Sequence, residues 1–117
     1  MTKPTILYCE ADEKTLNHEA AVFAKAGHHV VKVLGRKAME EALRGVSFDV
    51  AVLGHTLTRD DRHHLPYMIK KSNRHTHVVV LHASGKHPAV DIALDSRRGE
   101  RAVLEAIDSL LLQPAGT

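Results

Sequence analysis

Short continuous runs of apolar residues recur along the chain, and each run has the length of a buried β-strand. The clearest run is Val78–Leu81 and the weakest is Asp91–Leu94. Runs without polar alternation are typical of strands that are covered on both faces, as in parallel sheets. The predicted strands span residues 5–9, 30–33, 48–53, 78–81 and 91–94.

The segments between these runs change to a helical spacing of apolar residues. Asp12 is placed to cap a first helix that Gly27 ends. By contrast, residues 55–64 are polar and have no period, which predicts a loop. Pro66 fits a helix only in its first turn, so the helix after this loop is predicted to begin at about His64. The predicted helices span residues 13–26, 36–44, 64–72 and 99–112.

Strands and helices alternate along the chain, and this order predicts an α/β fold with a doubly wound parallel sheet. At 117 residues the chain has the size of a single domain, with a core at about residues 4–112 and a frayed tail at 113–117. In such folds a binding site lies at the carboxyl ends of the strands. The residues at those ends are 10–12, 54–58, 82–84 and 95–97.

Composition argues against several classes of function. Apolar residues make up 44% and charged residues 26%, as in ordinary globular proteins. The net charge of +2 and the scarcity of aromatic side chains argue against nucleic-acid binding. No run reaches the ~18 uncharged apolar residues of a membrane span, and no secretory signal precedes the first strand, so no membrane partner is predicted. A lone Cys9 is typical of the reducing cytoplasm.

Histidine is the unusual residue type, with ten copies. Their spacing does not bring three or four of them together as zinc requires, so neither a metal nor another cofactor is predicted. The nearest approach to such a site is His75 and His77, which would share one face of a strand. No arrangement of Ser, His and Asp resembles a nucleophile elbow, and the sequence does not predict an enzyme.

Five segments resemble, in order and spacing, a response-regulator receiver domain, the phosphoacceptor module of two-component signalling. The first helix, which ends at Ala26–Gly27, and the His28–Val31 segment after it are similar in length to the family's first helix and second strand. Ile6–Asp12 is similar to the family's first strand with its acidic motif, and Phe48–Gly54 to the third strand, which carries the phosphoaccepting aspartate. Val79–Ala83 and Val90–Leu94 resemble the fourth and fifth strands. The resemblance implies a flavodoxin-like (CheY-like) fold with five parallel strands in the order 2-1-3-4-5.

The residues that would carry receiver chemistry are mostly replaced at the matching positions. The resemblance implies a nucleophilic aspartate, two carboxylates that hold Mg²⁺, a hydroxyl and a lysine. Gly54 stands at the phosphoacceptor position, so neither a phosphoacceptor nor a catalytic residue is predicted. His82 stands at the hydroxyl position and Ser96 at the lysine position. The resulting degenerate pocket comprises Glu10, Ala11, Asp12, Gly54, His82 and Ser96.

The acidic residues Glu10 and Asp12 allow two interpretations. Their carboxylates could hold a cation at the strand ends, or Asp12 caps the following helix and Glu10 is a solvated remnant. The sequence favours the second interpretation, because helix N-caps commonly recruit aspartate. Asp60 and Asp61 follow Gly54 along the chain, and we expect them to cap a helix or to be solvated rather than to accept a phosphoryl group.

The last two predicted strands are separated only by Ser84–Ala89, which includes Gly85 and Pro88. This segment is too short for an ordinary helix of ~11 residues. The family's fourth helix is therefore predicted to be shortened or absent, and that helix is part of the face that many receivers use to dimerise and signal. Apolar side chains near Ile92 and Leu94 are then expected to lie closer to solvent.

Together these observations predict a cytoplasmic, non-phosphorylatable receiver-like module. It would act through protein–protein interaction in two-component, or phosphorelay, signal transduction. The implied partner is a protein of such a pathway, and a homodimer is left open. The alternative is a ligand- or metal-sensing domain that uses the altered pocket at Glu10, His82 and Ser96.

Overall fold

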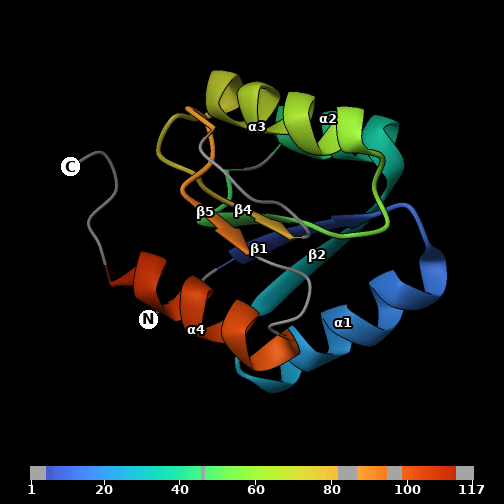
Figure 1. Ribbon diagram of the computed structural model, residues 1–117, viewed down its shortest axis with the longest axis vertical. Coiled ribbons are helices and arrows are strands. Elements are labelled where there is room, and N and C mark those ends of the chain that lie inside the picture. The colour runs from blue at the N-terminus through green and yellow to red at the C-terminus, as the bar shows by residue number, and fades with distance from the viewer. Residues whose placement is uncertain (1–4, 46, 82–86, 95–98, 113–117) are drawn as a thin grey trace.

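The computed structural model contains one sheet of five parallel strands. The structure describes residues 5–45, 47–81, 87–94 and 99–112. The strands are β1 (Thr5–Glu10), β2 (His29–Leu34), β3 (Val50–Leu53), β4 (His77–Leu81) and β5 (Ile92–Leu94). Their order in the sheet is β2-β1-β3-β4-β5 (Figure 1), which confirms the predicted flavodoxin-like topology.

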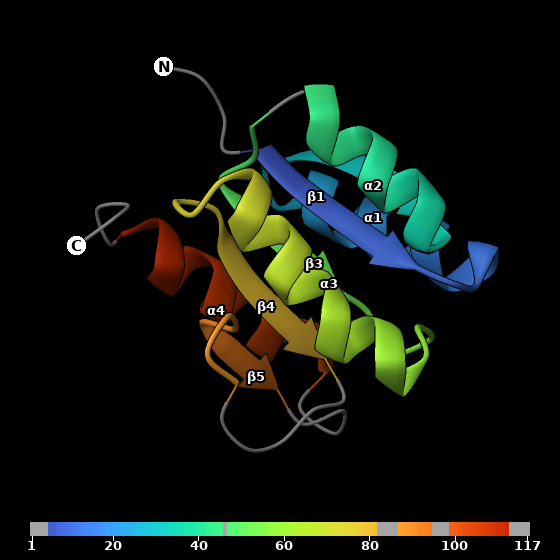
Figure 2. The ribbon, with the colours of Figure 1, turned by 90° about the horizontal axis from the view of Figure 1, so that it is seen from above.

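Four helices cover the sheet in the described part of the chain. Figures 1 and 2 show α1 and α4 on one face of the sheet and α2 and α3 on the other, so the fold is doubly wound as predicted. None of the described helices is long and apolar enough to cross a membrane. The bounds are α1 (Glu13–Lys25), α2 (Gly35–Gly45), α3 (Arg59–Ser72) and α4 (Gly99–Leu111).

The central strands are buried on both faces, which explains why they are apolar without alternation. In β1, Ile6 and Tyr8 pack with α1 and α4, whereas Leu7 and Cys9 pack with α2 and α3. Successive side chains of a strand point to opposite faces, so each face receives every second residue. The adjoining strand β3 is fully buried in the same way. Glu10 is the exception to this apolar pattern, at the carboxyl end of β1.

The connection between β4 and β5 contains no helix in its described part. Residues 87–91 form a turn, and the rest of this connection, 82–86, lies outside the described residues. The predicted loss or shortening of the fourth helix is thereby confirmed. Ile92 and Leu94 are half-buried and pack on the side of α4. The intervening Ala93 pairs with Val80, so it faces the side of α3, where a fourth helix would lie.

Helix α3 begins at Arg59 rather than at about His64, so the prediction of a loop over residues 59–63 is wrong. Thr58 caps the helix: its hydroxyl accepts a hydrogen bond from the backbone N–H of Asp61 at 3.1 Å. Asp60 and Asp61 lie in the first turn, the position expected for capping acids. Pro66 therefore lies well inside the helix, where it is buried against the core and supplies no backbone N–H.

Candidate functional site

The carboxyl ends of β1 and β3 lie side by side and bring Glu10 next to Gly54. Cys9 and Leu53 are in register across the two strands, and the Gly54 N–H donates to the Cys9 carbonyl at 2.9 Å. This edge of the sheet is where a doubly wound fold places its binding site. Glu10 and Gly54 of the predicted pocket are thus neighbours in space, although they are distant in sequence.

The Glu10 side chain is completely buried, which corrects the prediction that it is a solvated remnant. Its Oε1 accepts hydrogen bonds from the backbone N–H of Thr56 at 2.9 Å and from the Thr56 hydroxyl at 2.6 Å. Its Oε2 accepts a hydrogen bond from the Tyr8 hydroxyl, and His55 Nδ1 lies 3.9 Å from the same oxygen. A carboxylate is retained in the interior only with such partners, and here both oxygens have them.

Gly54 leaves room for this buried carboxylate. A Cβ atom at position 54 would lie only 1.8 Å from Glu10 Cδ and about as close to both carboxylate oxygens. The side chain of Glu10 therefore occupies the space that any side chain at position 54 would need. The glycine is required for space rather than for an unusual backbone conformation, because its φ angle is not among the positive ones.

Thr56 joins the two strand ends, and the sequence analysis did not identify it. Besides donating to Glu10, its hydroxyl accepts hydrogen bonds from the backbone N–H groups of Ala11 at 2.8 Å and Asp12 at 3.1 Å. One hydroxyl thus satisfies three groups of the β1–α1 turn. In the sequence, Thr56 lies two residues after Gly54, within the strand end 54–58 where a binding site is expected.

Tyr8 is the second missed residue, because it looked like an ordinary core position. Its ring packs edge-on against Phe23 with centroids 5.1 Å apart, and its hydroxyl reaches Glu10. Burial raises the pKa of the Tyr8 phenol well above its usual value, and the adjacent Glu10 adds to the rise. The phenol therefore stays protonated and remains a hydrogen-bond donor to Glu10.

Asp12 faces α1 and not the pocket. Its Oδ2 accepts hydrogen bonds from the backbone N–H of Thr15 at 2.9 Å and from the Thr15 hydroxyl at 2.8 Å, which confirms the predicted cap. These bonds lower the pKa of the exposed Asp12 carboxyl. Of the remaining predicted pocket residues, Ala11 is exposed, and His82 and Ser96 lie outside the described residues.

The described residues include no cluster of three or more His, Cys, Asp or Glu side chains that could hold a metal ion. Glu10 and Asp12 point into different hydrogen-bond networks, so these two carboxylates do not converge on one point. The arrangement around Gly54 is a closed polar network inside the protein. Its chemistry is that of a satisfied buried carboxylate.

Cys9 is predicted to be unreactive in the folded protein. Its thiol is fully buried, and burial, reinforced by Glu10, raises its pKa to about 12. A thiol with a raised pKa stays protonated until the pH approaches that value, so almost no thiolate exists at about pH 8. Ellman's reagent should detect no free thiol in the native protein and one thiol per chain in guanidinium. Rapid labelling of the native protein would contradict the burial of Cys9.

Comparison with known proteins identifies the fold. No protein-family model matches the chain, and no curated protein matches it significantly in sequence. Among solved structures, a two-component response regulator from Clostridium difficile is 12% identical with a TM-score of 0.81, covering 95% of this chain and 98% of its own.

Two further solved structures agree with this similarity. The signal receiver domain of a histidine kinase from Syntrophus aciditrophicus is 14% identical, with a TM-score of 0.81 and coverage of 97% of this chain and 94% of its own. A response regulator receiver protein from Sinorhizobium medicae is 18% identical, with a TM-score of 0.78 and coverage of 94% and 95%. The chain therefore has the fold of the response-regulator receiver domains.

Proposed function

We propose that this chain is a receiver-like signalling module that cannot be phosphorylated and that acts in the cytoplasm through protein–protein interaction. The proposal places it in two-component, or phosphorelay, signal transduction, in keeping with its fold and with the receiver proteins that it resembles. The observation that carries it is the burial of the Glu10 carboxylate over Gly54.

Phosphoryl transfer to a receiver needs a carboxylate that can attack phosphorus in line with the leaving group, and space around that carboxylate for the phosphoryl oxygens and a metal ion. At position 54 this chain has no side chain, and the space is filled by Glu10. The Glu10 oxygens accept hydrogen bonds from Tyr8 and Thr56 inside the protein. These contacts support a module without a phosphoacceptor and without catalytic activity.

The alternative, a ligand- or metal-sensing domain, has weaker support. It was predicted to use Glu10, His82 and Ser96, and only Glu10 lies among the described residues. A ligand at this point would have to replace the hydrogen bonds that Glu10 receives from Tyr8 and Thr56. Breaking such bonds leaves buried donors unpaired, which costs about 1–3 kcal/mol for each group.

We expect the purified protein to remain unphosphorylated when it is incubated with acetyl phosphate and Mg²⁺. Intact-mass spectrometry should show the unmodified mass only, because Gly54 has no side chain that could attack phosphorus. The carboxylate that lies over it, Glu10, is buried and accepts a hydrogen bond from Thr56. A receiver domain with a complete set of aspartates, treated in the same tube, serves as the positive control. A phosphorylated form of this chain that hydroxylamine removes would refute the proposal.

A further inference from the structure

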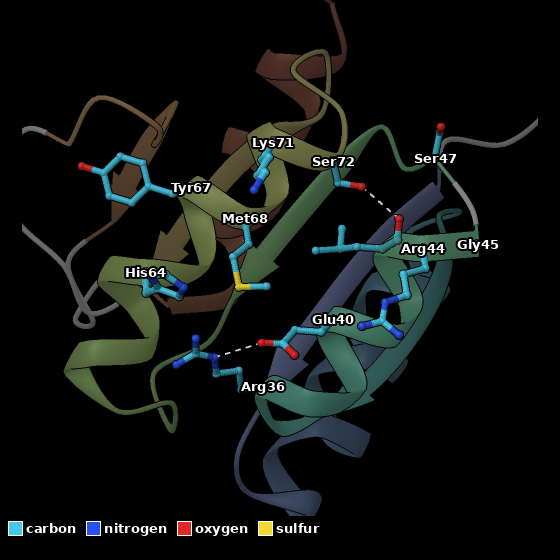
Figure 3. A pocket seen from close by; sticks show the side chains of 11 residues that line it. Arg36, Glu40, Arg44, Gly45, Ser47, His64, Tyr67, Met68, Lys71 and Ser72 are labelled. Carbon is cyan, nitrogen blue, oxygen red and sulfur yellow. Dashed lines mark hydrogen bonds and ion pairs between the residues drawn. The ribbon is translucent and has the colours of Figure 1, made fainter.

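A groove of about 890 Å³ runs between α2 and α3, on the face of the sheet away from α1 and α4. Figure 3 shows Arg36 and Glu40 at one end of it and Arg44 on the α2 side, with Met68 pointing from α3 toward α2. The groove is distinct from the buried network around Glu10. The lining residues that matter are Arg36, Leu43, Arg44, Tyr67, Met68 and Lys71.

The lining of the groove is positively charged. Arg36, Arg44 and Lys71 face one acidic lining residue, Glu40. Arg36 pairs with Glu40 at 3.1 Å and lies 3.8 Å from Asp61. In contrast, neither Arg44 nor Lys71 has an ion-pair partner among the residues that the structure describes. Arg44 on the α2 side and Lys71 on the α3 side are therefore free to receive carboxylates.

The inner surface of the groove is apolar. Leu43 and Met68 are half-buried and extend the core that lies between the sheet and these two helices. Tyr67 is one of the three large apolar side chains in the described residues that are notably exposed, at 44%. Its ring packs against His87 and His63, with ring centroids 4.6 Å and 5.9 Å away, and Figure 3 shows it pointing away from α2 at the outer edge of the groove.

We propose that the groove binds an acidic segment of a partner protein, an inference that rests on the proposed function as an interaction module. An apolar side chain of the segment would contact Leu43 and Met68, and its carboxylates would bind Arg44 and Lys71. An apolar surface flanked by cations fits an amphipathic acidic helix or strand. Charge complementarity of this kind selects partners and speeds their association.

A nucleic acid fits the same surface less well. Its phosphate backbone has no apolar group for Leu43 and Met68, and the groove offers only three cations. The net charge of the whole chain, +2, adds little attraction. An acidic protein segment satisfies both the charged and the apolar parts of the lining, so it is the occupant that the groove favours.

The test uses a fluorescein-labelled amphipathic peptide with glutamate on one helical face and leucine on the other. Fluorescence anisotropy with the full chain should detect binding, and the same peptide with lysine in place of glutamate should not bind. The double variant Arg44→Glu, Lys71→Glu should weaken binding at least about tenfold, because attraction becomes repulsion. The matched control is Lys14→Glu, Lys25→Glu, which reverses two exposed charges of α1 and should stay within about twofold of the wild type.

Several results would overturn the groove proposal: no binding of the acidic peptide by the wild type, equal weakening in both double variants, or tighter binding of a single-stranded oligonucleotide. Circular dichroism confirms that both double variants are folded before they are compared. The binding experiment uses no phosphoryl donor. If the chain stays unphosphorylated with acetyl phosphate but does not bind the peptide, only the groove proposal is refuted and the proposed function stands. Phosphorylation by acetyl phosphate would instead refute the proposed function and leave the binding result intact.

Discussion

Replacing Gly54 by aspartate is expected to destabilise the protein by about 3 kcal/mol without creating a phosphoacceptor. The new Cβ would lie 1.8 Å from Glu10 Cδ, so Glu10 must leave its place. Its departure breaks the hydrogen bonds with Tyr8 and Thr56 and brings two carboxylates into one buried site. Urea unfolding measures the loss of stability, and acetyl phosphate with mass spectrometry tests for modification.

A double-mutant cycle shows whether this cost comes from Glu10. Glu10→Ala alone should cost about 2–4 kcal/mol, because it leaves a cavity and unpaired donors. In the double variant, Glu10→Ala removes the clash and Gly54→Asp supplies a new carboxylate. Its free energy of unfolding should therefore fall by at least about 1 kcal/mol less than the sum of the two single losses. Strict additivity would mean that the two residues do not compete for space.

Gly45 provides the matched control. Apart from its chain neighbours and the backbone of its own helix, a Cβ atom there meets no heavy atom within 4 Å, and the φ angle of Gly45 is not positive. Gly45→Asp, near the end of α2, should therefore stay within about 1 kcal/mol of the wild type. If Gly54→Asp is no more harmful than Gly45→Asp, the carboxylate of Glu10 does not lie over Gly54.

Removing the Asp91 carboxylate is expected to loosen β5 and to cost about 2 kcal/mol. Asp91 Oδ2 accepts hydrogen bonds from the backbone N–H of Val78 at 2.7 Å and from Lys70 Nζ at 2.9 Å. Lys70 Nζ also donates to the Thr76 carbonyl at 2.7 Å, so this group ties α3, β4 and the start of β5 together. In Asp91→Ala, the partly buried donor of Val78 loses its partner and Lys70 loses its counter-charge.

Hydrogen exchange separates this local effect from a general loss of stability. The amides of β5 and of Val78 should exchange faster in Asp91→Ala than those of β1, at matched global stability. Asp91→Asn is the control, because its amide oxygen can still accept from Val78 and it should recover much of the loss. Uniform acceleration across the sheet would argue that Asp91 does not hold β5 in particular.

Local patterns were enough to predict most of the fold. The apolar runs located the strands. Asp12 could be identified as a cap because an N-cap bonds to residues in the first turn of its own helix, which are close to it in the sequence. The first residue of α3 was misplaced because the local pattern there was misleading. Residues 59–63 contain no apolar period, and Pro66 suggested a helix start, whereas the helix is begun by the cap at Thr58.

The candidate site was predicted less well, because its key contacts join distant parts of the chain. The sequence placed Glu10 and Gly54 in one pocket, but polarity alone suggested a solvated Glu10. Its burial depends on Thr56, 46 residues away, and on the hydroxyl of a core tyrosine. No local pattern reports such a pairing. The roles of His82 and Ser96 remain predictions, since both lie outside the described residues.

The carboxylate over Gly54 also has a consequence for control in the cell. A ligand shifts a conformational equilibrium only by its difference in affinity for the two states. A side chain of the protein itself is present in every molecule, so its amount cannot change with a signal as that of a ligand can. Under the proposed function, Glu10 fills the space at position 54 in every molecule. A phosphoryl group therefore cannot be added there to favour one conformation over the other. The fraction of partner bound would then follow mass action alone, set by how much of each protein the cell makes relative to their dissociation constant.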